Sequence, residues 1–457
     1  MSRLGQLILF AGVWVFISGV YMQDARPADS LGPGPEKKTL TRGEDFVVVH
    51  GKILKKNLGM DIGQMGLLAF HEGKPVPIPF QIDEINPDGD WVLTQVPPEL
   101  KNTGLKPEKD DDDGKLDGND ELAFMARDAG DRVKKEYYPP EILAADEIMI
   151  RDPVDGAKAW VYLCSFPGKP PLSDRDYVDY VFPGGRIKTQ NYEIGFSPEL
   201  PITPGYISIH GSHNILDRVK IRLQTKLLGI GFSLDETRLV SKLSLYKDGP
   251  IRVIRRTQSA VKFIGIFRTP SAAVENVYYE NVSIIPIRIK LPFSVKTFNK
   301  LIGYVKVRGT ADFQNIHGWR IKTDAGPNCW FNIDGKMDET EKNAEEKNFT
   351  WFLVSGPPGA FMIRLVTNRM PDGSFQETPI ISHLFYIDDD LSRDPPESVP
   401  GQSPDVGFWM DGIENLEKGI FYFYAISYII NDYTDGKEKE YLNILDQPLE
   451  VYAEPQG

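Results

Sequence analysis

The sequence predicts a mainly β protein with antiparallel β-sandwich architecture and few short helices. Short runs rich in β-branched and aromatic residues alternate with Gly, Pro and Asp along the chain. The 457 residues include 41 Gly and 35 Pro, which argues against a helical bundle, and 24 Phe and 19 Tyr, which half-buried sheets favour. Many short strands separated by turn signals indicate sheets packed face to face.

Residues 1–23 predict either a secretory signal peptide or an N-terminal membrane anchor. Arg3 precedes the apolar run Leu4–Met22, and the next charge is Asp24. A short positive segment before an apolar run is typical of an export signal, and this run is also about long enough to span a bilayer. Both alternatives carry the rest of the chain across a membrane, so we expect a periplasmic or cell-envelope location. Residues 24–42 indicate a Pro/Gly-rich linker.

The body of the chain predicts two β-sandwiches, a smaller one over residues 43–170 and a larger one over residues 171–457. Turn signals at Glu72–Gly73 and Asp155–Gly156 separate strand-like runs in the first, and Gly184–Gly185 does so in the second. The boundary lies in the Pro- and Gly-rich stretch 167–174. Residues 336–349 are polar and indicate a helical or disordered segment. Glu414 and Lys418, four residues apart, suit a single helical turn.

Charge and cysteine content narrow the functional classes. The net charge of −13 excludes nucleic acid as an expected partner. The two cysteines, Cys164 and Cys329, form no CxxC motif, so a cysteine zinc site is not supported. They form either one disulfide or two buried thiols. The sequence also lacks a GxSxG elbow, a Walker A loop, HExxH and GxGxxG.

The acidic stretch 109–122, KDDDDGKLDGNDEL, predicts either a calcium loop or a solvated charged turn. A calcium loop alternates oxygen ligands around a glycine turn. With Gly114 at the sixth position, Leu116 points into the core, and the flanking elements are expected to be strands. Lys109 cannot coordinate at the first position, and the last position lacks the usual bidentate Glu. The ligands would be the side chains of Asp111, Asp113, Asp117 and Asp120 and the carbonyl of Lys115.

Three histidines are the candidate catalytic residues. His210 and His213 form the only close pair, in HGSHN, and His317 is a weaker third. Histidine suits acid–base catalysis because its pKa lies near neutrality. The alternative, which the sequence favours, is a polar loop after a strand.

Aromatic and cationic residues supply candidate contacts to a glycan. Trp91, Trp319, Trp330 and Trp409 lie in turn-like, polar surroundings, where a ring can stack on a sugar, although each can equally be core. The residues Arg252, Arg255 and Arg256 suggest a cationic strand face that meets acidic glycan or lipid headgroups, or else pairs with Asp and Glu across the sheet.

Two stretches carry a resemblance to known proteins. The first joins KPVPIPFQIDE with DDDGKLDGNDELAFMARDAG, and the second is YKDGPIRVIRR. Together they resemble an uncharacterised family of exported bacterial β-sandwich proteins found beside glycan-degrading enzymes. More distantly they resemble the galactose-mutarotase-like supersandwich, which several polysaccharide lyases share. The resemblance covers scattered parts of residues 46–256. It implies a fold more than an activity, and it implies that the acidic turn is a scaffold element at a sheet edge.

We therefore expect an exported envelope protein that binds or processes a carbohydrate, with calcium steadying one loop. The alternative is a non-enzymatic structural or assembly component of the cell envelope, with a protein partner. The sequence does not choose between an enzyme and a binding protein. A membrane tether, where present, would be the N-terminal segment.

Overall fold

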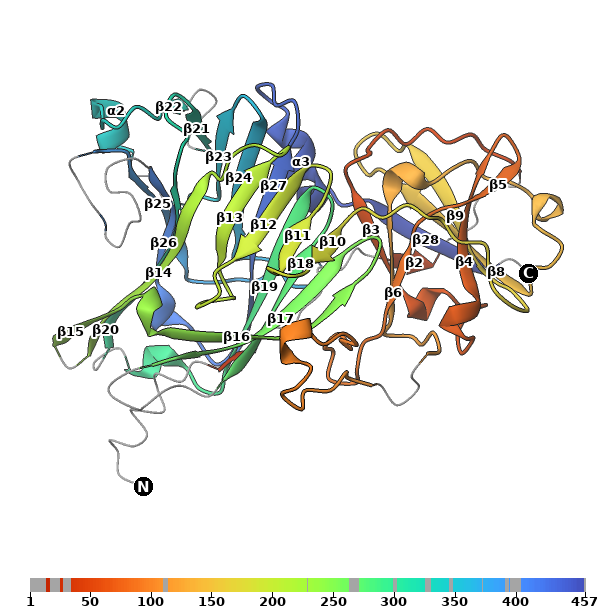
Figure 1. The fold of residues 1–457 in the computed structure, drawn as a ribbon, viewed down its shortest axis with the longest axis horizontal. Helices are drawn as coiled ribbons and strands as arrows, with labels where there is room; N and C mark the ends of the chain where they lie inside the picture. Colours follow the sequence, from red (N-terminus) through yellow and green to blue (C-terminus); the bar gives the residue numbers. More distant parts are fainter. Residues whose placement is uncertain are drawn as a thin grey trace.

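The computed structural model describes residues 14–16, 25–27, 34–109, 114–227, 229–262, 271–298, 302–324, 330–344, 348–371, 373–390, 394 and 404–455. Over these residues the predicted mainly β, antiparallel fold with few short helices is confirmed. Figure 1 shows a smaller lobe, built around β3 to β9 and β28, and a larger lobe that holds most other strands. Among the described strand pairs, β2 with β28 is parallel and the others are antiparallel.

The smaller lobe packs a six-stranded sheet against a three-stranded one. Val47 and Val49 share one core with Ile148 and Ile150, as the two-residue period of facing strands requires. The six-stranded sheet has the order β2 (Ala25–Pro27), β28 (Glu450–Pro455), β8 (Ala144–Arg151), β9 (Lys158–Ser165), β4 (Met65–His71) and β5 (Lys74–Pro77). The three-stranded sheet has the order β3 (Phe46–His50), β7 (Glu121–Met125) and β6 (Gln81–Asp83).

The last strand of the chain belongs to this smaller lobe. β28 pairs with β8 from Glu450 opposite Arg151 to Pro455 opposite Asp146. Val451 is fully buried in the core of the smaller lobe. The lobe therefore combines early residues with the C-terminal strand, and the sequence boundaries at 42/43 and 170/171 stay predictions.

A ten-stranded sheet forms the middle of the larger lobe and is covered on both faces. Met362 and Tyr428 face one core together with helix α3, whereas Phe361 and Ile429 face the core shared with two further sheets. The path of the sheet is β16 (Leu239–Asp248), β17 (Val253–Val261), β18 (Ala272–Tyr278), β19 (Val282–Leu291), β27 (Gly419–Ile430), β24 (Gly359–Val366), β23 (Trp351–Gly356), β21 (Arg320–Thr323) and β22 (Trp330–Asn332), and β1 (Trp14–Phe16) pairs with β19.

Two smaller sheets cover one face of the ten-stranded sheet. The four-stranded sheet is β10 (Asp179–Val181), β11 (Arg186–Lys188), β12 (Tyr192–Phe196) and β13 (Pro204–Ile209). The five-stranded sheet has the order β15 (Ile230–Leu234), β14 (Leu216–Leu227), β20 (Ile302–Phe313), β26 (Asp405–Asp411) and β25 (Ile381–Ile387).

Helices are short in the described part of the chain. The polar segment 336–349 contains α2 (Glu339–Lys342), which begins with an Asp338 capping box. α3 (Glu438–Asp446) was not predicted, and it packs on β27 through Tyr441. The 3-10 helices are η1 (Gly51–Ile53), η2 (Ile62–Gln64), η3 (Pro98–Leu100), η4 (Ala126–Asp128), η5 (Lys135–Tyr137), η6 (Glu236–Arg238), η7 (Val295–Phe298) and η8 (Ile413–Asn415), the last at the predicted helical turn. None of the helices described here is long and apolar enough to cross a bilayer.

Candidate functional site

The motif residues of the sequence meet at the contact between the two lobes, which we call the seam. Arg252 is 1% exposed and donates from Nε to Asp83 (2.7 Å) and from Nη2 to Glu121 (2.5 Å). Its Nη1 donates to the Tyr279 hydroxyl at 3.0 Å. Lys247 lies 2.9 Å from the other oxygen of Asp83. We call these five residues the Arg252 network.

In this network, ion pairing affects the pKa of Asp83 more strongly than burial does. Burial alone favours a neutral Asp83, but the charges of Lys247 and Arg252 outweigh it and lower the pKa of Asp83 to about 2. A buried guanidinium needs such partners because an unpaired charge in a dry core is costly. Both stretches that carry the family resemblance therefore contribute residues that join the lobes.

The expectation of an exposed cationic strand face is wrong. Arg252, Arg255 and Arg256 are all buried, and alternation along the chain sends Arg255 to the opposite side. Arg255 donates to the Tyr180 hydroxyl at 2.9 Å and lies over the ring of Phe196. Arg256 binds Glu275, its cross-strand partner on β18, as the alternative expected, and also binds Glu108. Each of these cations is paired with acidic or polar side chains whose identity sequence spacing alone does not reveal.

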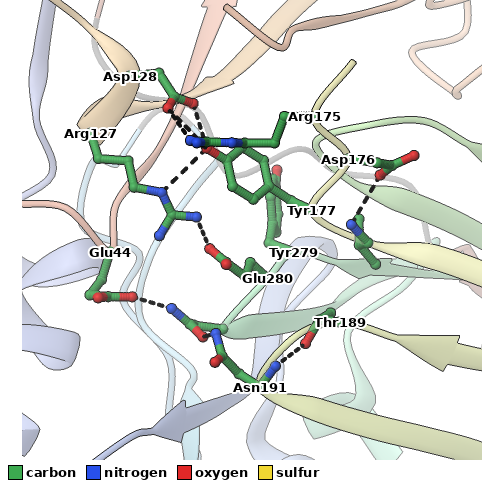
Figure 2. Close-up of polar contacts among 12 residues, drawn as sticks. Glu44, Arg127, Asp128, Arg175, Asp176, Tyr177, Thr189, Asn191, Tyr279 and Glu280 are labelled. Atoms are coloured by element: carbon green, nitrogen blue, oxygen red, sulfur yellow. Dashed lines mark hydrogen bonds and ion pairs between the residues drawn. The ribbon is translucent and has the colours of Figure 1, made fainter. Parts of the chain in front are cut away.

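A second polar group at the seam is partly open to solvent. Figure 2 shows its residues converging from the segment before β3, from η4, from the segment before β10, and from the turn between β18 and β19. We define the seam cluster as Glu44, Arg127, Asp128, Arg175, Tyr177, Asn191, Glu280 and Asn281.

Tyr177 is the centre of one half of the seam cluster. Its hydroxyl donates to Asp128 at 2.8 Å and accepts from Arg175 at 3.0 Å. The guanidinium carbon of Arg127 lies 4.5 Å from the centre of the Tyr177 ring. The side chain of Arg175 is 61% exposed, so this half of the cluster reaches the surface.

The other half of the cluster is a chain of amides and carboxylates. Arg127 donates to Glu280, and burial, opposed by Arg127, raises the pKa of Glu280. Asn191 donates to the side-chain oxygen of Asn281 at 2.5 Å, and Asn281 donates to Glu44 (Figure 2). Glu44 is only partly buried, whereas Asn191 and Asn281 are buried, so this half of the cluster reaches solvent through the Glu44 carboxylate.

The predicted histidines do not form an acid–base group with the seam cluster. His210 and His213 lie on the β13–β14 turn, and all three histidines are exposed. The ring of His213 hydrogen-bonds the Asn315 carbonyl at 2.8 Å and lies near Trp319, so it meets the loop that carries His317. They remain weak candidates by position.

The four tryptophans divide between core and covered surface. Trp91 and Trp319 are buried. Trp330 is partly buried, with the guanidinium of Arg320 over its ring at 4.4 Å. Trp409 is stacked with His383, with ring centroids 4.3 Å apart, and has Lys306 over its ring.

The described part of the acidic loop is closed by its own hydrogen bonds. Asp120 is 2% exposed and accepts from the N–H groups of Asp117 (2.8 Å) and Ile85 (3.1 Å). Burial raises the pKa of Asp120 to about 7. Leu116 is fully buried, as predicted, and β7 follows the loop directly. Asp111 and Asp113 lie outside the described residues, and the residues described include no group of three or more His, Cys, Asp or Glu that could hold a metal ion.

Cys164 is a free, buried thiol on β9, whose pKa is raised by burial. Cys329 lies outside the described residues.

Sequence reasoning missed the seam cluster because its members are spread over more than two hundred positions. Arg127 and Asp128 stand inside the stretch ELAFMARDAG that carries the resemblance, which was the available signal. Glu280 and Asn281 lie in a strand-like run, and nothing in the sequence around them indicated a functional role.

No family model and no curated protein matches the chain. Among solved structures, an alpha-mannosidase from Enterococcus faecalis V583 is similar with a TM-score of 0.42 and 8% identity, covering 93% of this chain and 46% of that chain. A protein in the glycosyl hydrolase family 38 from Enterococcus faecalis gives a TM-score of 0.40 and 7% identity, covering 93% of this chain and 47% of that chain. This chain spans less than half the length of either protein. At these TM-scores and identities the similarity assigns neither fold family, activity nor ligand.

Proposed function

We propose that the chain binds a carbohydrate at the seam cluster. The observation that carries the proposal is the convergence of guanidinium groups, carboxylates and side-chain amides from both lobes at an edge of the seam that reaches the surface at Arg175. Each sugar hydroxyl donates and accepts a hydrogen bond, and planar groups of this kind recognise it in pairs. The seam cluster lies on a 3-10 helix and on short segments that border packed strands, and its internal hydrogen bonds hold the groups in a fixed geometry.

The proposal is binding rather than hydrolysis. A glycosidase pairs a protonated carboxyl acid with a second, free carboxylate. Here Glu280 is paired with Arg127, and Asp128 accepts from both Tyr177 and Arg175. Their pairing favours fixed acceptors for ligand hydroxyls over proton transfer.

The test compares two arginines in similar settings. Arg175 and Arg186 are both largely exposed, and each lies over a tyrosine ring and pairs with a carboxylate. We would measure the melting temperature of the chain against neutral and acidic oligosaccharides, because a ligand that binds the folded state raises it. Arg175→Ala should abolish a rise that Arg186→Ala retains. A rise that both variants retain, or that both lose, would contradict binding at the seam.

The rival function, a non-enzymatic structural or assembly component of the envelope, is favoured by a different observation. The most distinctive charged motifs join the two lobes through the ion pairs of the Arg252 network. This candidate predicts that no oligosaccharide shifts the melting temperature and that crosslinking in native membranes recovers one defined partner. Recovery of the free chain alone would count against it.

We also propose that calcium steadies the acidic loop and that the protein is exported to the envelope. The first rests on the carboxylate density of residues 109–122 and the second on the apolar run Leu4–Met22. Calcium should raise the melting temperature and a chelator should reverse the rise. Cell fractionation tests the location.

A further inference from the structure

Large apolar side chains gather on the surface at one end of the larger lobe. They come from the β14–β15 hairpin, the end of β19, the loop before β25 and the starts of β25 and β27. We call this set the apolar end: Ile230 (63% exposed), Phe232 (44%), Phe293 (39%), Phe375 (74%), Ile381 (40%) and Ile420 (38%).

Backbone contacts place these elements together. Leu227, at the hairpin, pairs with Ile302 at the start of β20. The N–H of Val305 donates to Glu414 in η8, which connects β20 to the turn before β27. Leu291 pairs with Gly419, which brings the end of β19 beside the start of β27. Figure 1 shows β15 and β20 at the extremity of the larger lobe, away from the smaller lobe.

A small separate core lies where the end of β19 meets the start of β27. Leu291, Leu416, Phe421 and Phe423 are buried there. The residues packed around them are only partly buried, namely Ile287, Ile289, Val295, Ile380 and Ile413. Exposed apolar surface of this kind marks a site of contact with protein or lipid.

The charges near the apolar end favour a lipid surface over a protein partner. The chain carries a net charge of −13, yet exposed lysines occur on the same elements, namely Lys226, Lys290, Lys296 and Lys418, of which Lys296 is paired with the exposed Glu417. Apolar side chains ringed by lysine suit the boundary of an anionic bilayer, where the rings enter the headgroup region and the ammonium groups meet phosphates. β1 (Trp14–Phe16) pairs with β19 at Arg288 to Lys290, so these three apolar residues lie beside the same strand end.

We propose that the apolar end docks on the surface of an anionic lipid membrane. The contact is interfacial: Ile230, Phe232 and Phe293 enter the headgroup layer, and the larger lobe rests on the membrane by the end farthest from the smaller lobe. This holds the seam away from the lipid surface. The proposal does not depend on what the seam binds.

The test reads the environment of two equally exposed positions in the full-length chain. Ile230→Cys and Val154→Cys are each labelled with nitrobenzoxadiazole, since both native side chains are 63% exposed and lie on opposite lobes. The unsubstituted chain, labelled in parallel, corrects for Cys164 and Cys329. Vesicles of phosphatidylglycerol and phosphatidylcholine should raise the emission at position 230 several-fold and leave position 154 unchanged.

Three outcomes would overturn the proposal. Vesicle flotation with no change at position 230 would mean that the N-terminal run alone attaches the chain. A change at 230 that depends on protein concentration without vesicles would assign the surface to a second copy. Equal response to pure phosphatidylcholine would remove the anionic preference. In support, Lys226→Glu and Lys290→Glu should each weaken association with the anionic vesicles about fivefold.

Discussion

At the residue scale, Arg252 shows how a charge is tolerated inside the protein. Asp83, Glu121 and Tyr279 satisfy its guanidinium, and water does not reach it. We expect Asp83→Asn to lower the free energy of unfolding by about 3 kcal/mol, because it leaves a buried cation underpaired. Urea denaturation measures this. Glu339→Gln, which breaks the exposed pair with Lys342, should change it by less than about 0.5 kcal/mol.

The Asp83 carboxyl also makes the stability of the folded protein depend on pH in the acid range. The pKa of Asp83 is about 2 in the folded protein, held there by Lys247 and Arg252 against burial, and its ordinary value is 3.8. A lowered pKa contributes stability that is present above pH 4 and is lost as the pH falls toward 2. The chain should lose stability steeply over that window. If Asp83→Asn falls just as steeply there, the contribution of Asp83 is refuted.

The sequence could not predict these pairs. Arg252 stands 169 positions from Asp83 and 131 from Glu121, and nothing in local spacing links them. The sequence analysis placed Arg252, Arg255 and Arg256 on one cationic face, whereas strand alternation sends Arg255 to the opposite side and all three are buried. Residue-scale partners depend on how the two lobes meet.

At the scale of elements, the turn between β16 and β17 depends on a glycine. A Cβ on Gly249 would lie 2.3 Å from the side-chain oxygen of Gln81, which accepts from the Arg252 N–H. Gly249→Ala should therefore destabilise the chain by about 1–3 kcal/mol. Gly231→Ala, on exposed β15 with nothing within 4 Å, is the control and should be nearly neutral. Thermal unfolding of the two variants side by side is the measurement.

For Asp120 in the acidic loop, we expect the opposite pH dependence of stability from that of Asp83. Burial raises the pKa of Asp120 from 3.8 to about 7. A raised pKa contributes stability that is full below pH 4 and is lost as the pH rises through 7, on the order of 2–4 kcal/mol. Asp120→Asn should flatten part of the decline between pH 4 and 8 in unfolding titrations. Asp155→Asn, at an exposed turn, should leave it unchanged, and equal slopes in both variants would contradict the prediction.

Local signals served well for turns and poorly for one helix. The predicted turns at Glu72–Gly73, Asp155–Gly156 and Gly184–Gly185 separate β4 from β5, β8 from β9 and β10 from β11. Glycines with positive φ occur in each, which is why composition reveals them. α3 was not predicted because its buried apolar residues Tyr441, Ile444 and Leu445 span little more than one turn, which is too short for a periodic pattern.

At the scale of the molecule, composition was enough for the class of fold but not for its assembly. Alternating runs and turn residues specify sheets, whereas the ten-stranded sheet joins β1 to strands between residues 239 and 430 in an order that no local rule gives. The seam cluster exists only once both lobes are in place. Its residues could therefore not be predicted from the sequence, except for Arg127 and Asp128, which lie within a stretch that carries the resemblance.

The return of β28 to the smaller lobe leads to the last prediction. Deleting residues 450–457 removes a strand that pairs with β8 and exposes the core where Val451 and Ala453 are buried. We expect a loss of about 3–5 kcal/mol, comparable to emptying two or three buried apolar positions. Deleting residues 456–457 alone is the control. Hydrogen exchange should show faster exchange in β8 and β9 while β24 and β27 of the larger lobe stay protected. Uniform loss of protection in both lobes would mean that the seam couples them into one unfolding unit.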